Sequence, residues 1–192
     1  RRGFDVFEGL PYSNDNGPLH PTIRGIPPLP FYRNEAVIET DPDQAQFTHR
    51  FTQAAIDFIG THREQPFFVY VPQVMPHVPI FASAAYKGTS QRGLYGDVVQ
   101  ELDASVGELV QKLDEWKLMG NTLILFLSDN GPFLSYGTHA GKSGPFREGK
   151  LTTFEGGVRV PFIAVWDQKI PAGRECRELV TGLDVLPTLA KV

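Results

Sequence analysis

Three short segments of the sequence carry side chains that could do chemistry. Asp129 and Asn130 stand side by side and offer a carboxylate and an amide oxygen, both suitable ligands for Ca²⁺ or Mg²⁺. The run Pro76-His77-Val78-Pro79 holds a histidine on a restricted backbone, as suits a histidine that must meet a substrate at a set distance. The segment 149–159 combines charged residues with permissive glycines.

Each segment also has an ordinary interpretation. Ca²⁺ takes about six to eight oxygen ligands, so Asp129 and Asn130 alone do not make a site, and Asp-Asn-Gly after a strand is more often a turn. His77 could equally be a loop histidine that is hydrogen-bonded to the backbone. The segment 149–159 could be a solvated loop, in which Arg159 beside Glu155 predicts a structural ion pair. Taken singly, the residues leave these alternatives open.

Hydrophobic periodicity predicts the elements that must position these segments. Apolar residues at helical spacing predict helices, and short apolar runs between breakers predict buried strands. In chain order, the pattern predicts a helix over 47–62, a strand over 67–71, a helix over 94–118, a strand over 122–128, a strand near 160–166 and a short helix after Asp184-Val185-Leu186-Pro187. The near-continuous apolar character of 122–128 is typical of a central parallel strand covered on both faces.

Strands that alternate with helices predict an α/β fold, a layered sheet flanked by helices. Ligands in such sheets bind beyond the carboxyl ends of the strands, where His77 and Asp129 are predicted to lie. Residues 1–46, dense in proline, glycine and asparagine, are predicted to be an irregular, loop-rich segment ahead of an α/β core over 47–192. Because such long loops usually belong to a functional surface of something larger, we expect that Arg1 is not the natural N-terminus.

Composition and charge exclude several classes of protein. The chain has 192 residues with 18 basic and 22 acidic side chains, a formal charge of −4, so it offers no broad basic field for a nucleic acid. No apolar run approaches the roughly 20 residues of a membrane-spanning helix, and this chain carries no recognisable targeting signal. Cys176 is the lone cysteine, which excludes an internal disulfide framework. We therefore expect neither nucleic acid nor membrane as a partner.

Together, the three segments resemble the sulfatase family, the formylglycine-dependent enzymes with an alkaline-phosphatase-like fold. Met75-Pro76-His77-Val78-Pro79 is similar to that family's active-site histidine segment, 122–131 to its metal-ligand strand, and 144–159 to its active-site lysine loop. Their order and spacing are also similar, and Gly3-Phe4-Asp5 and Pro11-Tyr12-Ser13-Asn14-Asp15 resemble arylsulfatase-type members. The resemblance implies that residues 1–192 are the middle and later part of a sulfatase catalytic domain whose N-terminal part lies outside this chain.

The resemblance implies hydrolysis of sulfate monoesters at the S–O bond. Asp129 and Asn130 would be two ligands of a Ca²⁺ ion that screens the sulfate oxygens, and Lys150 would clamp the sulfate and the ester oxygen. His77 would contact the bridging oxygen and help to protonate the leaving alcohol or phenol. His139 lies in a loop where many of these enzymes approach their substrate. The implied substrates are sulfated small molecules or sulfated carbohydrates.

Parts of the family's active site have no match in this chain. The nucleophile is a formylglycine made from Cys or Ser in a Cys/Ser-x-Pro-x-Arg motif, which the family places upstream, with the remaining metal-ligand carboxylates and a further lysine and histidine. Ser143-Gly144-Pro145-Phe146-Arg147 fits the pattern loosely but lies inside the lysine loop. Cys176 lacks a proline two residues on. Leu151 is a smaller departure, since the family usually has glycine or another small or polar residue after the lysine.

The resemblance therefore predicts a fragment that is inactive by itself and that has the rest of the sulfatase polypeptide as its partner. Two alternatives stay open. One is a phosphatase or phosphonate hydrolase of the same superfamily, which would share the metal strand, and the other is a non-catalytic module that binds sulfated ligands. Sulfatases are commonly exported to the periplasm or the extracellular space, with delivery to lysosomes as the alternative.

Overall fold

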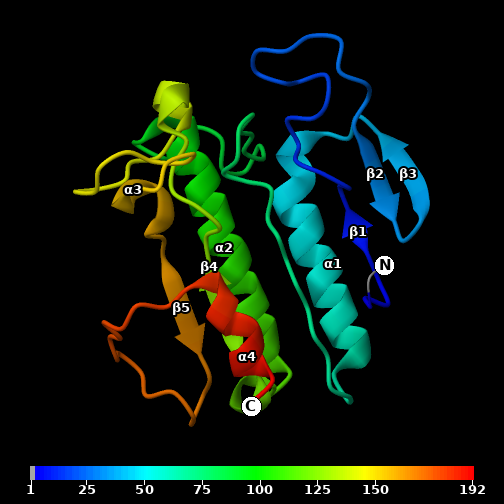
Figure 1. Ribbon diagram of the computed structural model, residues 1–192. Coiled ribbons are helices and arrows are strands. Elements are labelled where there is room, and N and C mark those ends of the chain that lie inside the picture. The colour runs from blue at the N-terminus through cyan, green and yellow to red at the C-terminus, as the bar shows by residue number, and fades with distance from the viewer. Residues whose placement is uncertain (1–2) are drawn as a thin grey trace. The chain divides into compact units, whose positions relative to one another are not determined.

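The computed structural model describes residues 3–192 (Figure 1). The chain divides into two compact units. The first unit holds the residues up to Leu118 together with Leu134–Gly141, and the second unit holds Met119–Phe133 and Lys142–Val192. Among the described residues, no helix is both long and apolar enough to cross a membrane.

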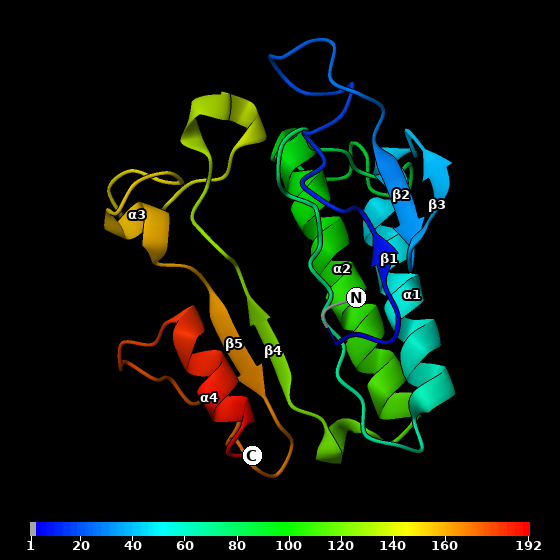
Figure 2. The same cartoon turned by 45° about the vertical axis from the view of Figure 1, so that its right-hand side comes forward.

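A small antiparallel sheet lies near the start of the first unit. Its strands, in the order β1-β2-β3, are β1 (Glu8–Gly9), β2 (Pro30–Arg33) and β3 (Ala36–Thr40) (Figures 1 and 2). Asn34 in the β2–β3 turn has a φ of 55°, and its side chain accepts a hydrogen bond from the Phe7 amide at 3.1 Å. The prediction of an irregular segment over 1–46 is wrong for these strands, because short strands among prolines show too little alternation to be recognised.

Helix α1 (Phe47–His62) joins this sheet through stacked aromatic rings. The ring centroid of Phe31 on β2 lies 6.1 Å from that of Phe47 and 6.0 Å from that of Phe51. Together with Leu29, these rings form a buried hydrophobic cluster. Because each buried ring removes a large apolar area from water, the cluster anchors the loop-rich N-terminal segment to α1. The predicted helix over 47–62 is confirmed.

Helix α2 (Gly93–Glu115) packs against α1 (Figure 1). A Cβ atom on Gly60 would lie 3.2 Å from the ring of Trp116, so the glycine allows the indole to lie close to the α1 backbone. The predicted helix over 94–118 is confirmed, but it ends at Glu115 because Lys117 adopts a φ of 59°, a left-handed conformation that stops a helix.

Two carboxylates of α2 are buried, although the helical pattern alone placed charged residues outside the apolar stripe. Asp97 accepts hydrogen bonds from the amides of Gly88 at 2.8 Å and Ser90 at 2.7 Å. Glu101 accepts one from the amide of Ser83 at 2.8 Å. The Gly88 and Ser90 amides hold the pKa of Asp97 below its ordinary value, because they stabilise the ionised carboxylate. These bonds fasten the preceding loop to the helix.

The second unit contains an antiparallel pair of strands, β4 (Ile124–Leu127) and β5 (Phe162–Val165), with Ile124 opposite Val165. The predicted strands over 122–128 and near 160–166 are confirmed as strands, but the burial expected of them is not seen, since no residue of β4 or β5 is buried. The parallel neighbour expected for 122–128 is not found among residues 3–192, where β4 pairs only with β5. An apolar run indicates burial and carries no information on strand direction, which explains the difference.

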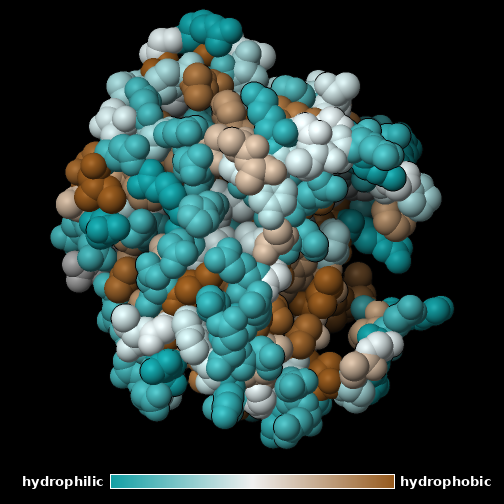
Figure 3. Space-filling model, turned by 180° about the vertical axis from the view of Figure 1, so that it is seen from behind, coloured by the Kyte–Doolittle hydropathy of each residue, from teal (hydrophilic) through white to brown (hydrophobic). Residues whose placement is uncertain are grey.

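Several apolar side chains of the second unit are exposed. Ile163 on β5 is 55% exposed. Leu183, in the 3₁₀ turn Gly182–Asp184, is 85% exposed, and Leu186, in the helix α4 (Val185–Leu189), is 75% exposed. The face shown in Figure 3 likewise has hydrophobic residues among polar ones. The short helix predicted after Asp184-Val185-Leu186-Pro187 is found as α4, which begins earlier, at Val185. Exposed apolar side chains also occur in the first unit, for example Ile23 and Val37. Contiguous exposed apolar surface is typical of a contact with another part of a protein.

The predicted strand over 67–71 is wrong. These residues form neither strand nor helix, and Phe68 and Tyr70 are 62% and 68% exposed. Val71 packs on the aromatic cluster of the first unit together with Val74. The segment thus has alternating burial without a partner strand among the described residues, and an apolar run in a sequence does not reveal whether a partner is present.

Asp97 gives a prediction about stability and pH. Because its folded-state pKa lies below the ordinary value of 3.8, its hydrogen bonds stabilise the fold above that pH and cease to do so as the pH falls through the lowered pKa. Asp97→Asn should therefore lower the thermal midpoint at neutral pH. It should also make the thermal midpoint fall less as the pH is lowered into the acid range. Thermal unfolding followed by circular dichroism over a pH series measures both, with Asp103→Asn, an exposed carboxylate of the same helix, as the control. Equal midpoints for the two variants would contradict this role.

Candidate active site

Strand β4 leads into a turn that carries Asp129 and Asn130. The Ser128 hydroxyl donates a hydrogen bond to the Asn130 carbonyl at 2.9 Å, and the Ser128 amide donates to the Pro161 carbonyl at 3.3 Å. The Asp129 side chain is exposed, and its carboxylate has no hydrogen bond or ion pair with any residue of 3–192. The segment is therefore a turn, and the turn leaves the carboxylate available to a ligand.

Backbone hydrogen bonds join this turn to the lysine loop of the second unit. The Lys150 amide donates to the Pro132 carbonyl at 2.9 Å, and the Gly131 amide donates to the Gly157 carbonyl at 2.9 Å. Both bonds begin or end within three residues of Asn130. The residues expected to act as metal ligands and the residue expected to clamp the sulfate thus lie on adjoining backbone segments.

Three glycines make this close approach possible. A Cβ atom on Gly131 would collide with the carbonyl oxygen of Gly156, and one on Gly156 would lie 2.6 Å from the carbonyl oxygen of Arg147. A Cβ atom on Gly157 would lie 2.6 Å from the carbonyl oxygen of Gly149. A side chain at Gly131 would push the turn away from the lysine loop, whereas side chains at Gly156 and Gly157 would clash within the lysine loop itself. These glycines therefore serve packing as well as backbone freedom.

Lys150 is half-buried and keeps its ammonium free of carboxylates. Its Nζ atom lies 5.4 Å from the centroid of the Phe133 ring, a weak cation–π contact. No residue of 3–192 forms an ion pair with it. A cation held over a ring without a neighbouring carboxylate remains available to an anionic ligand.

The backbone on both sides of Lys150 is strained. Glu148 has a φ of 63° and Leu151 a φ of 75°, a region that residues with a Cβ atom rarely adopt. The Leu151 side chain is 82% exposed, so no burial of that side chain offsets the strain. The left-handed conformation explains why glycine suits the position after the lysine. Strained residues of this kind cluster at functional sites.

The arginines of the lysine loop have structural contacts. Arg159 forms an ion pair with Glu155 at 3.1 Å, as predicted, and its guanidinium lies 4.8 Å from the Phe146 ring centroid. Arg147 lies 3.9 Å from the Phe154 ring centroid. These contacts tie the two halves of the loop together and leave Lys150 as its uncommitted cation among the described residues.

Ser143, the serine of the loosely matching Ser-x-Pro-x-Arg run, also has a structural contact. Its hydroxyl donates a hydrogen bond to the Phe146 carbonyl at 2.9 Å. The Phe146 amide donates back to the Ser143 carbonyl at 3.2 Å, which closes a turn at Gly144. The serine therefore stabilises a turn, in keeping with its rejection as a nucleophile.

His77 lies in the first unit on a tightly held loop that includes cis peptide bonds before Pro76 and Pro79. The Nδ1 atom is 2.7 Å from the Val78 carbonyl oxygen. A carbonyl only accepts hydrogen bonds, so Nδ1 carries a proton and the Nε2 atom is left to exchange a proton with a ligand. His77 is thus hydrogen-bonded to the backbone through Nδ1, as the alternative interpretation predicted. Its Nε2 atom is not used in that bond.

Buried Asn14 holds this histidine loop. Its Nδ2 atom donates hydrogen bonds to the Pro79 carbonyl at 3.0 Å and to Gln44 Oε1 at 2.9 Å. Sequence analysis did not single out Asn14 for a role, since an asparagine beside Asp15 in a loop is typical of a turn. Its place in a run that resembles sulfatases was the one signal that could have found it.

The structure brings together Asp129, Asn130 and Lys150 within the second unit. His77 belongs to the first unit, as does His139, an exposed residue at the end of the 3₁₀ segment Leu134–His139. The predicted site residues are therefore divided between the two units, and each group is described within its own unit. Phe133, which lies under the Lys150 ammonium, was not recognised from the sequence because an aromatic residue in a loop gives no specific signal.

Asp129 and Asn130 are the types of ligand that a hard cation prefers, but two ligands are too few to hold one. Asp129 and Asn130 provide a carboxylate and an amide oxygen, which suit Ca²⁺. Within residues 3–192, however, no group of three or more His, Cys, Asp and Glu side chains could hold a metal ion. Any cation at this turn would need further oxygen ligands.

The described residues form mixed helices and strands, and the chain is similar to the crystal structure of PsFucS1 sulfatase, with a TM-score of 0.76 and 28% identity over 90% of this chain and 40% of the other. The fold is therefore the alkaline-phosphatase-like α/β fold of sulfatases. The Sulfatase family model matches residues 1–192, so the chain belongs to the sulfatase family. It is 40% identical to N-acetylgalactosamine-6-sulfatase of Canis lupus familiaris over 98% of this chain, and 38% identical to arylsulfatase A of Bos taurus over 98% of this chain.

The chain spans 38% of the length of the first of these relatives and 40% of the second. Among solved structures, it is similar to the crystal structure of Ps i-CgsB in complex with k-i-k-neocarrahexaose, with a TM-score of 0.74 and 33% identity. That match covers 84% of this chain and 36% of the other. The expected sulfatase resemblance and α/β fold are confirmed.

Leu151 gives a prediction about stability. Leu151→Gly should stabilise the chain by about 1 kcal/mol, because glycine adopts the left-handed conformation without strain and little packing is lost. Leu179→Gly, an exposed leucine of the same unit without a positive φ, should stabilise nothing and serves as the matched control. Urea denaturation measures both variants. A loss of stability in Leu151→Gly equal to that in Leu179→Gly would show that the backbone at position 151 is not strained.

Proposed function

We propose that this chain is part of a Ca²⁺-dependent sulfatase that hydrolyses sulfate monoesters at the S–O bond. The observation that carries the proposal is the backbone pairing of the turn at Asp129 and Asn130 with the loop that bears Lys150. It brings a free carboxylate and a free ammonium onto adjoining segments. The unpaired carboxylate of Asp129 can bind a cation, and the unpaired ammonium of Lys150 can bind an anion.

Lys150 binds and orients the sulfate group in this proposal. Its ammonium attracts the anionic oxygens, and the contact with Phe133 restricts where the side chain lies. Asp129 and Asn130 hold Ca²⁺, which when bound supplies positive charge beside the sulfate oxygens. The remaining metal ligands and the formylglycine nucleophile come from polypeptide outside residues 1–192.

His77 moves the proton in this proposal. With Nδ1 bonded to the Val78 carbonyl, the ring has one orientation, and Nε2 can give a proton to the oxygen of the leaving alcohol or phenol. Asn14 positions the loop by its hydrogen bond to the Pro79 carbonyl. His139 remains a candidate for substrate contact, since its side chain is exposed at the end of a loop segment.

We propose a sulfated carbohydrate as the substrate, with other sulfated small molecules as the wider class. One relative is named for N-acetylgalactosamine 6-sulfate chemistry, and one similar structure contains neocarrahexaose. We further propose that the isolated chain is inactive and that the rest of the sulfatase polypeptide covers the exposed apolar side chains of the second unit, such as Ile163 and Leu186. Export to the periplasm or the extracellular space, or delivery to lysosomes, is proposed by analogy with the family.

Lys150→Ala tests the proposal in the longest native polypeptide that contains this sequence. We expect kcat/KM for an aryl sulfate to fall by about a hundredfold or more, as when one preorganised charge stabiliser is removed from an active site. Lys191→Ala, an exposed lysine near the end of the chain, should leave the rate unchanged. Release of sulfate and of phosphate is measured on matched aryl esters. Release of phosphate alone would favour the phosphatase alternative, and release of neither would favour a binding module.

Calcium binding gives a second test. Removal of Ca²⁺ by a chelator should abolish sulfate release from that polypeptide, and Asp129→Asn should weaken Ca²⁺ binding about tenfold or more through loss of a charged ligand. The 192-residue chain alone should bind Ca²⁺ more weakly than about 1 mM, since it offers two ligands of the six to eight required. Calorimetry measures each affinity, with Asp167→Asn as control. Tight binding to the isolated chain would contradict the expectation that ligands lie elsewhere.

A further inference from the structure

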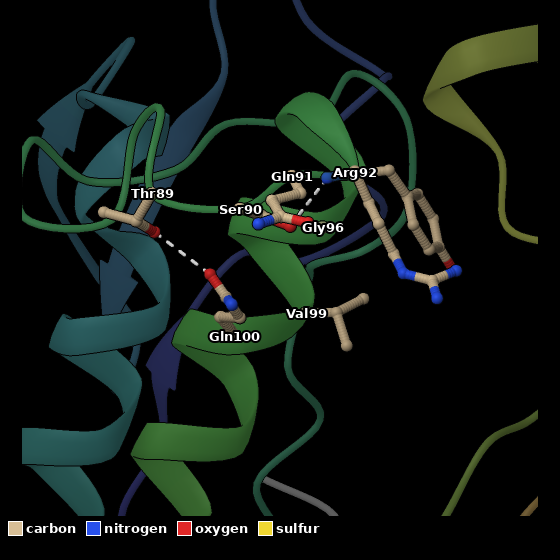
Figure 4. Close-up of a pocket in the computed structure, with 8 residues that line it drawn as sticks. Thr89, Ser90, Gln91, Arg92, Gly96, Val99 and Gln100 are labelled. Atoms are coloured by element: carbon tan, nitrogen blue, oxygen red, sulfur yellow. Dashed lines mark hydrogen bonds between the residues drawn. The ribbon is translucent and has the colours of Figure 1, made fainter.

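A cavity of about 570 Å³ lies where α2 begins, entirely within the first unit. It is lined by residues of the helix and of the loop before it, among them Thr89, Gln91, Arg92, Tyr95, Val99 and Gln100 (Figure 4). Its volume is within the range of cavities that hold small molecules. The proposed catalytic groups do not include any of these residues.

The wall of this cavity is rigidly attached to the helix. Buried Asp97 binds the amides of Gly88 and Ser90, and the Ser90 hydroxyl accepts a hydrogen bond from the Arg92 amide at 3.0 Å. A Cβ atom on Gly96 would lie 2.8 Å from the Cβ atom of Arg92, so the loop packs directly on the helix backbone. The cavity is therefore formed before any ligand arrives, which lowers the entropic cost of binding.

Arg92 supplies an unpaired positive charge to the cavity. Its side chain is exposed, and its guanidinium has no hydrogen bond or ion pair with the residues that the structure describes. Arg33 and Arg50, by contrast, pair with carboxylates at 3.0 Å and 2.6 Å. A guanidinium can form a two-point contact with a sulfate or a carboxylate, so the free fork of Arg92 suits an anionic group on a ligand.

Tyr95 and Val99 supply apolar surface beside this charge. Tyr95 is half-buried, and burial raises the pKa of its hydroxyl. A Cβ atom on Gly141 would lie 2.9 Å from the Cζ atom of Tyr95, so the ring is held against the backbone of that loop. A fixed aromatic ring next to an aliphatic side chain can take the apolar face of a sugar ring.

Amide and hydroxyl groups complete the lining. The Thr89 hydroxyl lies 2.7 Å from the Tyr86 carbonyl oxygen and 3.0 Å from Gln100 Oε1, so Thr89 links the loop to the Gln100 side chain. Figure 4 shows Arg92 and Val99 on one side of the helix end, Thr89 and Gln100 on the other, and Gln91 near the start of the helix. Donors around an apolar patch with one free cation match a polyhydroxylated ligand that bears an anion.

We propose that this cavity binds a sugar residue that carries a sulfate or a carboxylate group. The substrate class rests on the proposed sulfatase function, and the site adds a contact with the saccharide that no catalytic residue makes. Arg92 holds the anionic group, and Tyr95 and Val99 contact the apolar face of the ring. A nucleic acid is a poor fit, because the cavity offers one cation in a chain with a formal charge of −4.

The test uses the longest native polypeptide that contains this sequence, with Lys150→Ala to prevent turnover. The probes are a sulfated carrageenan hexasaccharide, a chondroitin 6-sulfate hexasaccharide and the desulfated carrageenan hexasaccharide, and calorimetry measures affinity. Arg92→Gln should weaken binding of at least one sulfated probe about tenfold, the effect of losing one charge-assisted contact. Arg63→Gln, an exposed arginine of the same unit, should not weaken it. Tyr95→Leu should weaken sulfated and desulfated carrageenan by similar factors.

Equal affinities of Arg92→Gln and Arg63→Gln for both sulfated probes would overturn the inference, and so would the absence of binding to the parent protein. Sulfate release from an aryl sulfate by the unsubstituted protein tests the proposed function separately. Release of sulfate with no effect of Arg92→Gln would overturn this inference alone. Binding that depends on Arg92 without any sulfate release would overturn the proposed function and leave the saccharide site in place.

Discussion

Close backbone contact between the turn after β4 and the lysine loop is the constraint on which the candidate active site depends. Main-chain hydrogen bonds from Lys150 and Gly131 make the contact, each worth about 1 kcal/mol net, and neither uses a functional side chain. The carboxylate of Asp129 and the ammonium of Lys150 therefore stay free while their backbones are fixed. Because Gly131 leaves no room for a Cβ atom against the Gly156 carbonyl, the contact is sensitive to a single methyl group. A site built in this way has a rigid frame and uncommitted charges.

In the first unit, hydrogen bonds also fix the loop backbones, but they come from buried side chains and not from the main chain. There, buried polar side chains hold loop backbones: Asn14 holds the loop of His77, and Asp97 holds the loop that walls the α2 cavity. A buried carbonyl or amide without a partner costs more than the bond itself contributes, so each such side chain fixes one loop conformation. Loops without regular structure thus become firm supports, which accounts for a long, proline-rich N-terminal segment in an ordered chain.

Local pattern predicted what depends on local spacing. Apolar residues at helical spacing predicted α1 and α2, and apolar runs predicted β4 and β5. The order of the three motifs predicted the family. Strand direction, the absence of a partner strand for 67–71 among residues 3–192 and the short strands β1 to β3 depend on distant residues, so no local pattern encodes them. Burial of Asp97 was missed for a similar reason, since a carboxylate on a helix is usually solvated unless a neighbouring loop supplies amides. The candidate site residues could be predicted from their residue types and motifs. The packing role of the neighbouring glycines is visible only in the structure.

Charge pairing separates the structural cations of the described chain from the candidate functional ones. Exposed ion pairs such as those of Arg33 and Arg159 contribute about 1 kcal/mol or less, so their main effect is to occupy the cation. Lys150 and Arg92 have no carboxylate partner among residues 3–192, and each lies beside an aromatic side chain or cavity that restricts it. An anion that binds there displaces no internal partner and loses only water. A sulfated saccharide has anionic groups and apolar ring faces within one molecule, so it is a ligand class that suits either cation, each within its own unit.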